Sequence, residues 1–368
     1  MKSILKKSFI FFLIIFLFSG CEEKNNDEIK IGFVAGLSGK YSALGISIRD
    51  GFLLAFDECD YMINGHAVKI TEKDDKQKAQ EAKKAISYFI ENDFKLIVGN
   101  STSSMTKISI EEINKQKNSL LISATASSDS FSRKDDNFLR IQVEQSEKRY
   151  KNLLEYVKKK NYKSIFLIYD SKNISYVNGY ATTFQNMYIN SGEKKFINKM
   201  DINGDYLDIL KQLEFSNEDL IIVVANSIDT ANLIQYIRYN NIKTDVVSSG
   251  WAKTMDFIEN GGKYVENVIF STGYDDNYKG ELFVGFVKRF QEKYGKTPSV
   301  FAVQGYELGK ILIYNLKQST DFSTLKQRIL EVKEYTGLQG NIVFDKYGDV
   351  SRKYFLMHVK NKKFQKIN

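Results

Sequence analysis

The chain has 368 residues, of which 43% are hydrophobic and 13% aromatic, so it can bury substantial cores and is long enough for two domains. Its formal net charge is +8, but the lysines are spread among Asp, Glu and Asn with no block of five or more, which favours solvated faces over a nucleic-acid groove. Cys21 and Cys59 are its only cysteines, and because Cys21 lies in the N-terminal export segment described next, we expect no intramolecular disulfide.

Residues 1–20 have the features of an export signal: they begin with lysines, continue with an apolar run over 9–18 and end before Cys21. This run is too short to cross a bilayer, which takes about 20 helical residues. The end of the segment resembles a bacterial lipobox, in which the signal is cut before Cys21 and this cysteine is lipidated, although Phe18 replaces the usual aliphatic residue. An uncleaved anchor is the alternative, and it places the protein on the same side of the membrane. We therefore predict a lipoprotein signal peptide, a solvated tether over 21–28, and an exported, membrane-anchored lipoprotein on the periplasmic or cell-surface side.

From residue 29 onward, strand and helix patterns alternate. Apolar β-branched runs predict strands, and apolar residues spaced three or four apart predict helices. Strands are expected over 29–35, 67–71, 96–98, 120–122, 138–141, 164–169, 195–200, 220–225, 245–248 and 265–271. Helices are expected between them, over 42–60, 77–92, 105–117, 144–160, 176–190, 206–213, 229–240 and 254–259. This alternation predicts an α/β protein with parallel sheets covered on both faces, arranged as two doubly wound lobes.

The last part of the chain contains fewer strands. Helices are expected over 281–294, 299–318 and 322–332, with short strands only over 341–344 and 354–359. We expect so few strands to form no third sheet, and the helices to pack against a sheet already formed.

Two of the predicted strands end in runs of hydroxyl residues. Strand 96–98 is followed by NSTSS over 100–104, and strand 120–122 opens into SATASS over 123–128. The start of a helix carries unpaired N–H groups and partial positive charge, so hydroxyls there suit a small anion such as a carboxylate or phosphate. A single Ser or Thr can simply cap its helix, but these runs are longer than a cap needs. Adjacent parallel strands place both turns at one sheet edge, where open α/β folds bind ligands.

Short motifs run along residues 29 to 365. In chain order they are Ile31-Gly32, Leu37-Ser38-Gly39-x-Tyr41-x-Ala43-x-Gly45, Arg49-x-Gly51, Asp74-Asp75, Val98-Gly99, Ser123-x-Thr125-x-Ser127, Phe138-Leu139-Arg140, Tyr176-x-x-Gly179, Gly250-Trp251, Tyr294-Gly295-x-x-Pro298, Tyr306, Leu338-x-Gly340, Phe344-Asp345 and Gly348-Asp349. Each is weak alone, but their order and spacing resemble extracytoplasmic solute-binding proteins of the Leu/Ile/Val type, which have a type I periplasmic binding fold and serve ABC importers. The resemblance implies a three-crossover hinge, with lobe 1 over 27–142 plus 272–350 and lobe 2 over 143–271 plus 351–368.

The resemblance also implies a ligand site between the lobes. In this family the carboxylate of an amino-acid ligand is held by hydroxyls and backbone N–H groups of the first lobe. By motif position these contacts fall on Ser103, the backbone of Thr125 and Ser127, at the strand ends described above. A second-lobe Tyr that closes over the ligand falls on Tyr176, for which the alternative is an aromatic in the first turn of a core helix.

Four further residues are candidates for the cleft wall. The resemblance implies that the turn with Ser38 and Tyr41 faces the cleft. Trp251, the only Trp, follows a strand end, where lining the cleft is favoured over core packing. Asn226 stands where the family has another aromatic contact of lobe 2.

Gly250 stands where amino-acid binders of this family carry the acid that pairs with the ligand ammonium. A buried ammonium without a carboxylate is costly, so either another acid such as Asp229 or Asp275 substitutes or the ligand lacks an amine. Asp229 has the alternative of capping its helix. We expect a small carboxylate-bearing solute, with branched-chain or aliphatic amino acids first and amine-free carboxylates or amides second.

Enzymatic readings find no support. His66 and His358 are the only histidines and fit neither a nucleophile triad nor a metal spacing, so we expect no catalytic residue, metal or cofactor. Phosphate-binding glycine motifs are absent from the sequence. The expected partners are the small ligand, ABC permease subunits and the membrane through the lipid on Cys21, but no nucleic acid. The alternative function is a lipid-anchored sensor with the same clamshell; the lack of a membrane or kinase segment after Asn368 favours the importer component.

Overall fold

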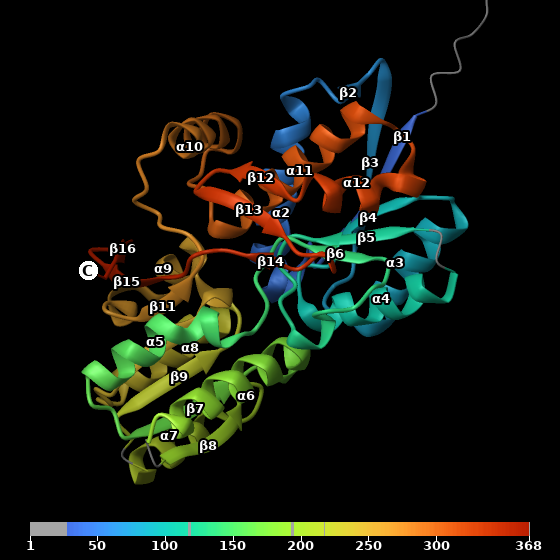
Figure 1. Cartoon of the computed structure of the whole chain (residues 1–368). Coiled ribbons are helices and arrows are strands. Elements are labelled where there is room, and N and C mark those ends of the chain that lie inside the picture. The colour runs from blue at the N-terminus through green and yellow to red at the C-terminus, as the bar shows by residue number, and fades with distance from the viewer. Residues whose placement is uncertain (1–27, 117–118, 193–194, 217, 368) are drawn as a thin grey trace, which may run out of the picture.

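The computed structural model describes residues 28–116, 119–192, 195–216 and 218–367, which form two lobes (Figure 1). The predicted signal peptide, Cys21 and the tether up to residue 27 lie outside the described residues. Within the described ranges, no helix is long and apolar enough to cross a membrane.

The first lobe is built on a six-stranded sheet with the order β2-β3-β1-β4-β5-β6. Its strands are β1 (Ile29–Ala35), β2 (Met62–Ile63), β3 (His66–Asp74), β4 (Leu96–Gly99), β5 (Leu120–Ser123) and β6 (Phe138–Arg140). All pair in parallel except β2, which forms an antiparallel hairpin with β3. Successive side chains of β1 enter opposite cores: Phe33 packs in the core that includes α2 (Ser42–Asp57) and α11 (Val300–Gln318), and Val34 packs with α3 (Ala79–Glu91) and α4 (Ser103–Gln116).

The second lobe is built on a seven-stranded sheet with the order β16-β15-β11-β10-β9-β7-β8. Its strands are β7 (Ser164–Tyr169), β8 (Lys195–Asp201), β9 (Leu220–Val224), β10 (Asp245–Ser249), β11 (Ile269–Thr272), β15 (Phe355–Lys360) and β16 (Lys363–Lys366). Alternate residues of β7 again face opposite cores. Ile165 and Leu167 pack with α5 (Glu147–Lys159) and α6 (Ile174–Asn190). Phe166 and Ile168 pack with α7 (Tyr206–Ser216), α8 (Ser227–Tyr239) and α9 (Met255–Gly261).

The predicted fold class is confirmed: two doubly wound α/β lobes are joined by crossings of the chain between β6 and α5, between β11 and α10 (Glu281–Tyr294), and between β14 and β15. Neither sheet is purely parallel, because β2 pairs antiparallel with β3 in the first sheet, and β15 and β16 add to the second sheet in antiparallel pairing. The other helices are α12 (Leu325–Val332) and the 3-10 turns η1 (Gly39–Tyr41), η2 (Asp129–Phe131), η3 (Ser171–Asn173), η4 (Gly250–Ala252), η5 (Gly262–Val265) and η6 (Phe322–Thr324).

The expectation that the last part of the chain forms no third sheet is wrong. β12 (Glu334–Gly337), β13 (Gly340–Phe344) and β14 (Val350–Ser351) form a three-stranded antiparallel sheet. β12 and β13 are joined by a two-residue turn, and Gly340 adopts a positive φ of 101°. β13 matches the strand predicted over 341–344, but β12 and β14 were missed, because strands this short contain too few apolar positions to show a period of two.

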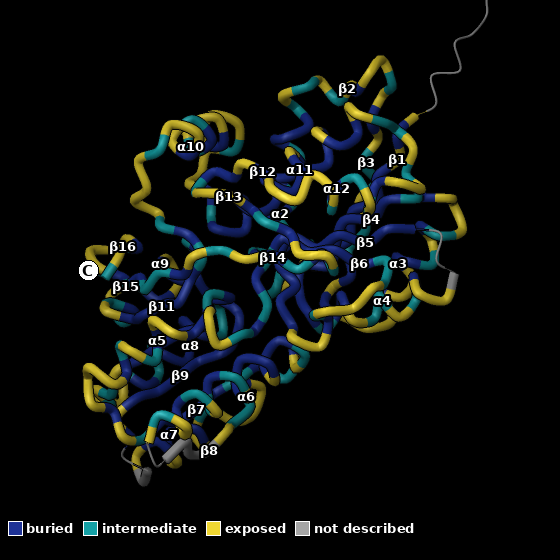
Figure 2. Tube along the Cα trace, in the orientation of Figure 1, coloured by how far each residue is buried: buried dark blue, intermediate teal, exposed yellow. Residues whose placement is uncertain are grey.

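Burial follows the layers, with the central strands of the two large sheets buried and the outer helix faces exposed (Figure 2). α2 and α11 approach closely through small residues. A Cβ on Gly51 would lie 1.9 Å from the carbonyl oxygen of Ala302, and one on Gly305 would lie 2.1 Å from that of Ile48. This helix pair bears on the site, because η1 leads into α2 and α11 begins at the cleft.

Candidate functional site

A cavity of about 40 Å³ lies between the two lobes. Its walls come from the carboxyl ends of β4, β5, β10 and β11, the first turns of α4, α5, α6 and α11, and the segments that cross between the lobes. One water needs about 10–15 Å³ by a comparable measure, so the cavity suits a small solute and not a peptide or a nucleic acid.

Ser103 and Ser127 meet at the first-lobe side of this cavity. Ser103 is the first residue of α4, two residues before the predicted start of the helix. Its Oγ accepts hydrogen bonds from the backbone N–H groups of Ser127 and Ser128, at 3.1 and 3.2 Å. Ser127 Oγ accepts from Gln145 Nε2 at 3.1 Å. Both oxygens thus already accept, and because neither hydroxyl donates to another group in the described part of the chain, each hydrogen can be donated to whatever fills the cavity.

Thr125 also lines the cavity, but its polar groups are engaged within the first lobe. Its Oγ1 donates to the carbonyl oxygen of Ser101 at 2.7 Å, and its backbone N–H points to Ser123 Oγ at 3.3 Å. Thr125 therefore shapes the turn that carries Ser127.

Tyr176 and Trp251 form an aromatic wall contributed by the second lobe. Their rings meet edge to face, with centroids 5.9 Å apart. The opposite contact of Trp251 is Tyr41 of the first lobe, whose ring stacks at 6.2 Å. Tyr41 itself does not line the cavity: its hydroxyl donates to Asp170 Oδ2 at 3.0 Å, across the lobes. Burial, reinforced by Asp170, raises the pKa of Tyr41 above its usual value, so the hydroxyl keeps its proton and its bond to Asp170 even in alkaline solution.

Ser38 and Asn226 lie away from the cavity wall. Ser38 Oγ donates to Asp74 Oδ2 at 2.6 Å. Asn226 caps α8, and its Oδ1 accepts from the backbone N–H of Asp229 at 3.0 Å. Neither side chain therefore faces the ligand space in this structure.

Neither acid proposed as a substitute for the missing ammonium partner reaches the cavity. Asp229 pairs with Lys40 of the first lobe at 2.7 Å, and so links the lobes. Asp275 lies 4.0 Å from Lys366. Among the described residues, no Asp or Glu lines the cavity.

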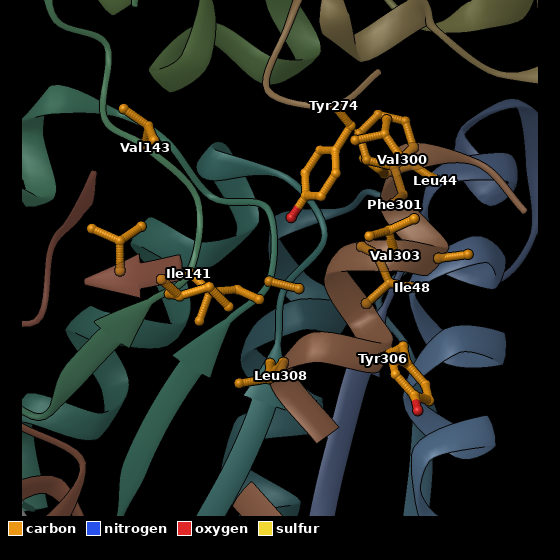
Figure 3. Packing of buried hydrophobic residues seen from close by; sticks show 14 of the residues in the cluster. Leu44, Ile48, Ile141, Val143, Tyr274, Val300, Phe301, Val303, Tyr306 and Leu308 are labelled. Carbon is orange, nitrogen blue, oxygen red and sulfur yellow. The ribbon is translucent and has the colours of Figure 1, made fainter. Parts of the chain in front are cut away.

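An apolar wall was missed from the sequence. Tyr274, Val300, Phe301 and Leu44 gather at one side of the cavity (Figure 3). Tyr274 is held by its hydroxyl, which donates to the buried carboxylate of Glu307 at 2.5 Å. No local pattern marks this wall, because it joins the first turns of α2 and α11 to the crossing segment after β11.

Arg149 was missed as well and is the one charged residue among the described cavity-lining side chains. It lies in the first turn of α5 and is only 5% exposed. Its Nη1 donates to the carbonyl oxygen of Val143 at 2.8 Å. A cation in the first turn of a helix opposes the helix dipole, but Lys148 lies in the same turn, so the sequence offered no signal that singles out Arg149.

The lobes touch directly around the cavity. The backbone N–H of Ser104 donates to Asn173 Oδ1 at 3.1 Å, and the N–H of Ser175 donates to Ser104 Oγ at 3.1 Å. With the contacts of Lys40 and Tyr41, these bonds describe a closed form. A small cavity enclosed by two α/β lobes defines a two-lobed ligand-binding protein.

The comparison with known families agrees. Residues 28–364 match the family described as periplasmic binding protein, and the chain belongs to this family. It is accordingly a small-ligand-binding protein and not an enzyme, as predicted, and membership places it among exported proteins. A comparison with curated proteins found no match.

Several solved structures share the fold. The leucine-binding protein LivK from Thermotoga maritima is 20% identical, with a TM-score of 0.84 over 92% of this chain and 98% of that one. LivJ from Streptococcus pneumoniae, in complex with isoleucine, is 22% identical, with a TM-score of 0.83 over 93% and 99%. A solute-binding protein from R. palustris, in complex with benzoate, is 16% identical, with a TM-score of 0.82 over 92% and 95%.

Proposed function

We propose that the protein binds a small carboxylate-bearing solute in the cavity between its lobes and delivers it to the permease of an ABC importer. The observation that carries this proposal is the pair of hydroxyls on Ser103 and Ser127. Because N–H donors already occupy acceptor positions of both oxygens, the pair offers hydrogens to the cavity and favours an anionic oxygen there. The buried Ser271 Oγ, which has no hydrogen-bond partner in the described part of the chain, adds a further polar group to the wall.

The solved relatives support the chemical class. Isoleucine and benzoate, the ligands named for LivJ and the R. palustris protein, both carry a carboxylate, but only isoleucine carries an amine. In this proposal the ligand contacts are Ser103, Ser127, Tyr176 and Trp251, while Thr125 shapes the turn.

The remaining parts of the proposal concern the frame of the molecule. In this proposal lobe 1 comprises 27–142 plus 272–350, and lobe 2 comprises 143–271 plus 351–368. The strands support this division, because β1 to β6 form one large sheet, and β7 to β11 with β15 and β16 form the other. Cys21 carries the lipid that anchors the protein at the membrane, close to the permease.

A thermal-shift screen tests the proposal. A ligand at 100 times its dissociation constant adds about 2.7 kcal/mol of stability, which moves the midpoint by a few degrees. We expect hits among small carboxylates, with or without an amine. Stabilisation by sugars or neutral amides only, with every carboxylate silent, would contradict the proposal.

A further inference from the structure

Arg149 carries a charge that nothing in the described protein neutralises. Three other cations are as deeply buried, and each has an acidic partner. Arg140 pairs with Asp349 at 2.6 Å, Arg352 with Glu307 at 2.6 Å, and Lys253 with Asp276. Among the described residues, Arg149 has no such acid.

The surroundings of Arg149 hold its guanidinium in place but do not neutralise it. Its central carbon lies 5.2, 5.8 and 5.9 Å from the ring centroids of Tyr354, Tyr150 and Tyr176. These are cation–π contacts, and the only hydrogen bond of the guanidinium within the described residues, to the Val143 carbonyl oxygen, uses one of its five N–H donors. The guanidinium is therefore fixed against the cavity with donors to spare.

This arrangement is unfavourable for the empty protein. A buried cation without a counter-charge costs several kcal/mol, and its place in the first turn of α5 sets it against the helix dipole. An anion in the cavity would offset both the buried charge and the unfavourable helix dipole. A purely structural role of Arg149 does not explain these costs, because each of the other buried cations is paired with an acid.

We infer that Arg149 is the counter-ion of the ligand and that the ligand is an amine-free carboxylate with an apolar body. This inference rests on the proposed function and narrows it. The described cavity wall holds one positive and no negative side chain, so a carboxylate brings it to neutrality. The ammonium of an amino acid would restore the unbalanced charge, repel Arg149 and find no carboxylate among the described wall residues. The rings of Tyr176, Trp251, Tyr274 and Phe301 provide the surface for the apolar body.

Calorimetry with matched ligands tests the inference without any variant. The first probes are 4-methylpentanoate, leucine, which adds only the 2-amine, and 4-methylpentanamide, which removes the charge. The pair 3-phenylpropanoate and phenylalanine repeats the comparison with an aromatic body. In at least one series the acid should bind 10-fold or more tightly than its amino acid, and 4-methylpentanamide should bind 10-fold or more weakly than 4-methylpentanoate. Leucine and phenylalanine binding as tightly as their acids would overturn the inference but leave the proposed function standing. If no carboxylate binds, the proposed function and the inference both fail.

Variants then assign the effect to the side chain. Arg149→Gln should weaken binding of the preferred acid about 100-fold, and Arg149→Lys, which keeps the charge but not the planar fork, about 10-fold. Arg238→Gln is the matched control, since Arg238 also donates to backbone carbonyls, those of Ile242 and Thr244, but does not line the cavity. Its affinity should equal that of the wild type.

Melting of the ligand-free variants separates binding from structure. Because Arg149→Gln removes an unpaired buried charge, its melting temperature should not fall below that of Arg238→Gln. Wild-type affinity of Arg149→Gln for the acid would overturn the inference. If Arg149→Gln does not fold, Arg149→Lys takes its place. The inference would then be overturned if Arg149→Lys bound the acid as tightly as the wild type and if the wild type bound leucine and 4-methylpentanoate equally well.

Discussion

Replacing Ser103 and Ser127 together by alanine should weaken binding of the preferred carboxylate by about 100-fold or more. Each hydroxyl supplies one hydrogen bond to a charged oxygen, worth about 1.5–3 kcal/mol, or roughly 10- to 100-fold in affinity. Calorimetry measures the loss with the acid that stabilises the wild type most.

The two serines should differ in their effect on the empty protein. Ser103 Oγ also satisfies the buried N–H groups of Ser127 and Ser128, so Ser103→Ala should lower the free energy of unfolding by about 1–3 kcal/mol. Ser127→Ala leaves only Gln145 Nε2 without its acceptor. Ser109→Ala is the control: this serine is buried in the same helix and bonds to Asn100, but it lies off the cavity and should lose stability without losing affinity. Wild-type affinity of the double variant would place the anion site elsewhere.

Gly51→Ala should produce the largest loss of stability from a single methyl group. The new Cβ would lie 1.9 Å from the backbone oxygen of Ala302, and real contacts of this kind do not approach within 3.0 Å. Because the obstacle is backbone, α2 and α11 must move apart. We expect a cost of about 3 kcal/mol, at the upper end of overpacking effects, and weaker ligand binding, since both helices lead to the cavity.

Gly285→Ala is the matched control for this prediction. Gly285 lies within α10, and a Cβ there would meet only the flexible end of Arg289, at 3.2 Å. The substitution should stabilise the protein by about 0.5–1 kcal/mol through helix propensity. Thermal unfolding followed by circular dichroism compares the two. Equal melting temperatures for the Gly51 and Gly285 variants would show that the close crossing of α2 and α11 is not important for stability.

The local pattern of apolar residues was enough to predict most of the fold. β1, β7 and α10 span the ranges that their hydrophobic patterns predict. It sufficed also for the hydroxyl turns, because buried strand ends and helix starts are both local features. It did not suffice for the third sheet, where β14 has only two residues, too few to show any period.

The charge of the site could not be predicted in the same way. Arg149 stands among Lys148 and Lys151 in a helix rich in charges, and nothing in its immediate neighbours distinguishes it. Its burial depends on Tyr176 and Tyr354, which arrive from α6 and from the segment before β15. Asp229 shows the reverse case: its position in the sequence makes it a candidate ligand contact, but the folded chain places Lys40 beside it.

Small-angle scattering tests most directly the central claim, that the solute binds between the lobes and holds them closed. The cavity receives groups from both lobes, and contacts such as Tyr41 with Asp170 exist only when the lobes meet. The carboxylate with the largest thermal shift is titrated to saturation. The account predicts a smaller radius of gyration for the bound protein than for the free protein. An unchanged radius at saturation would contradict it.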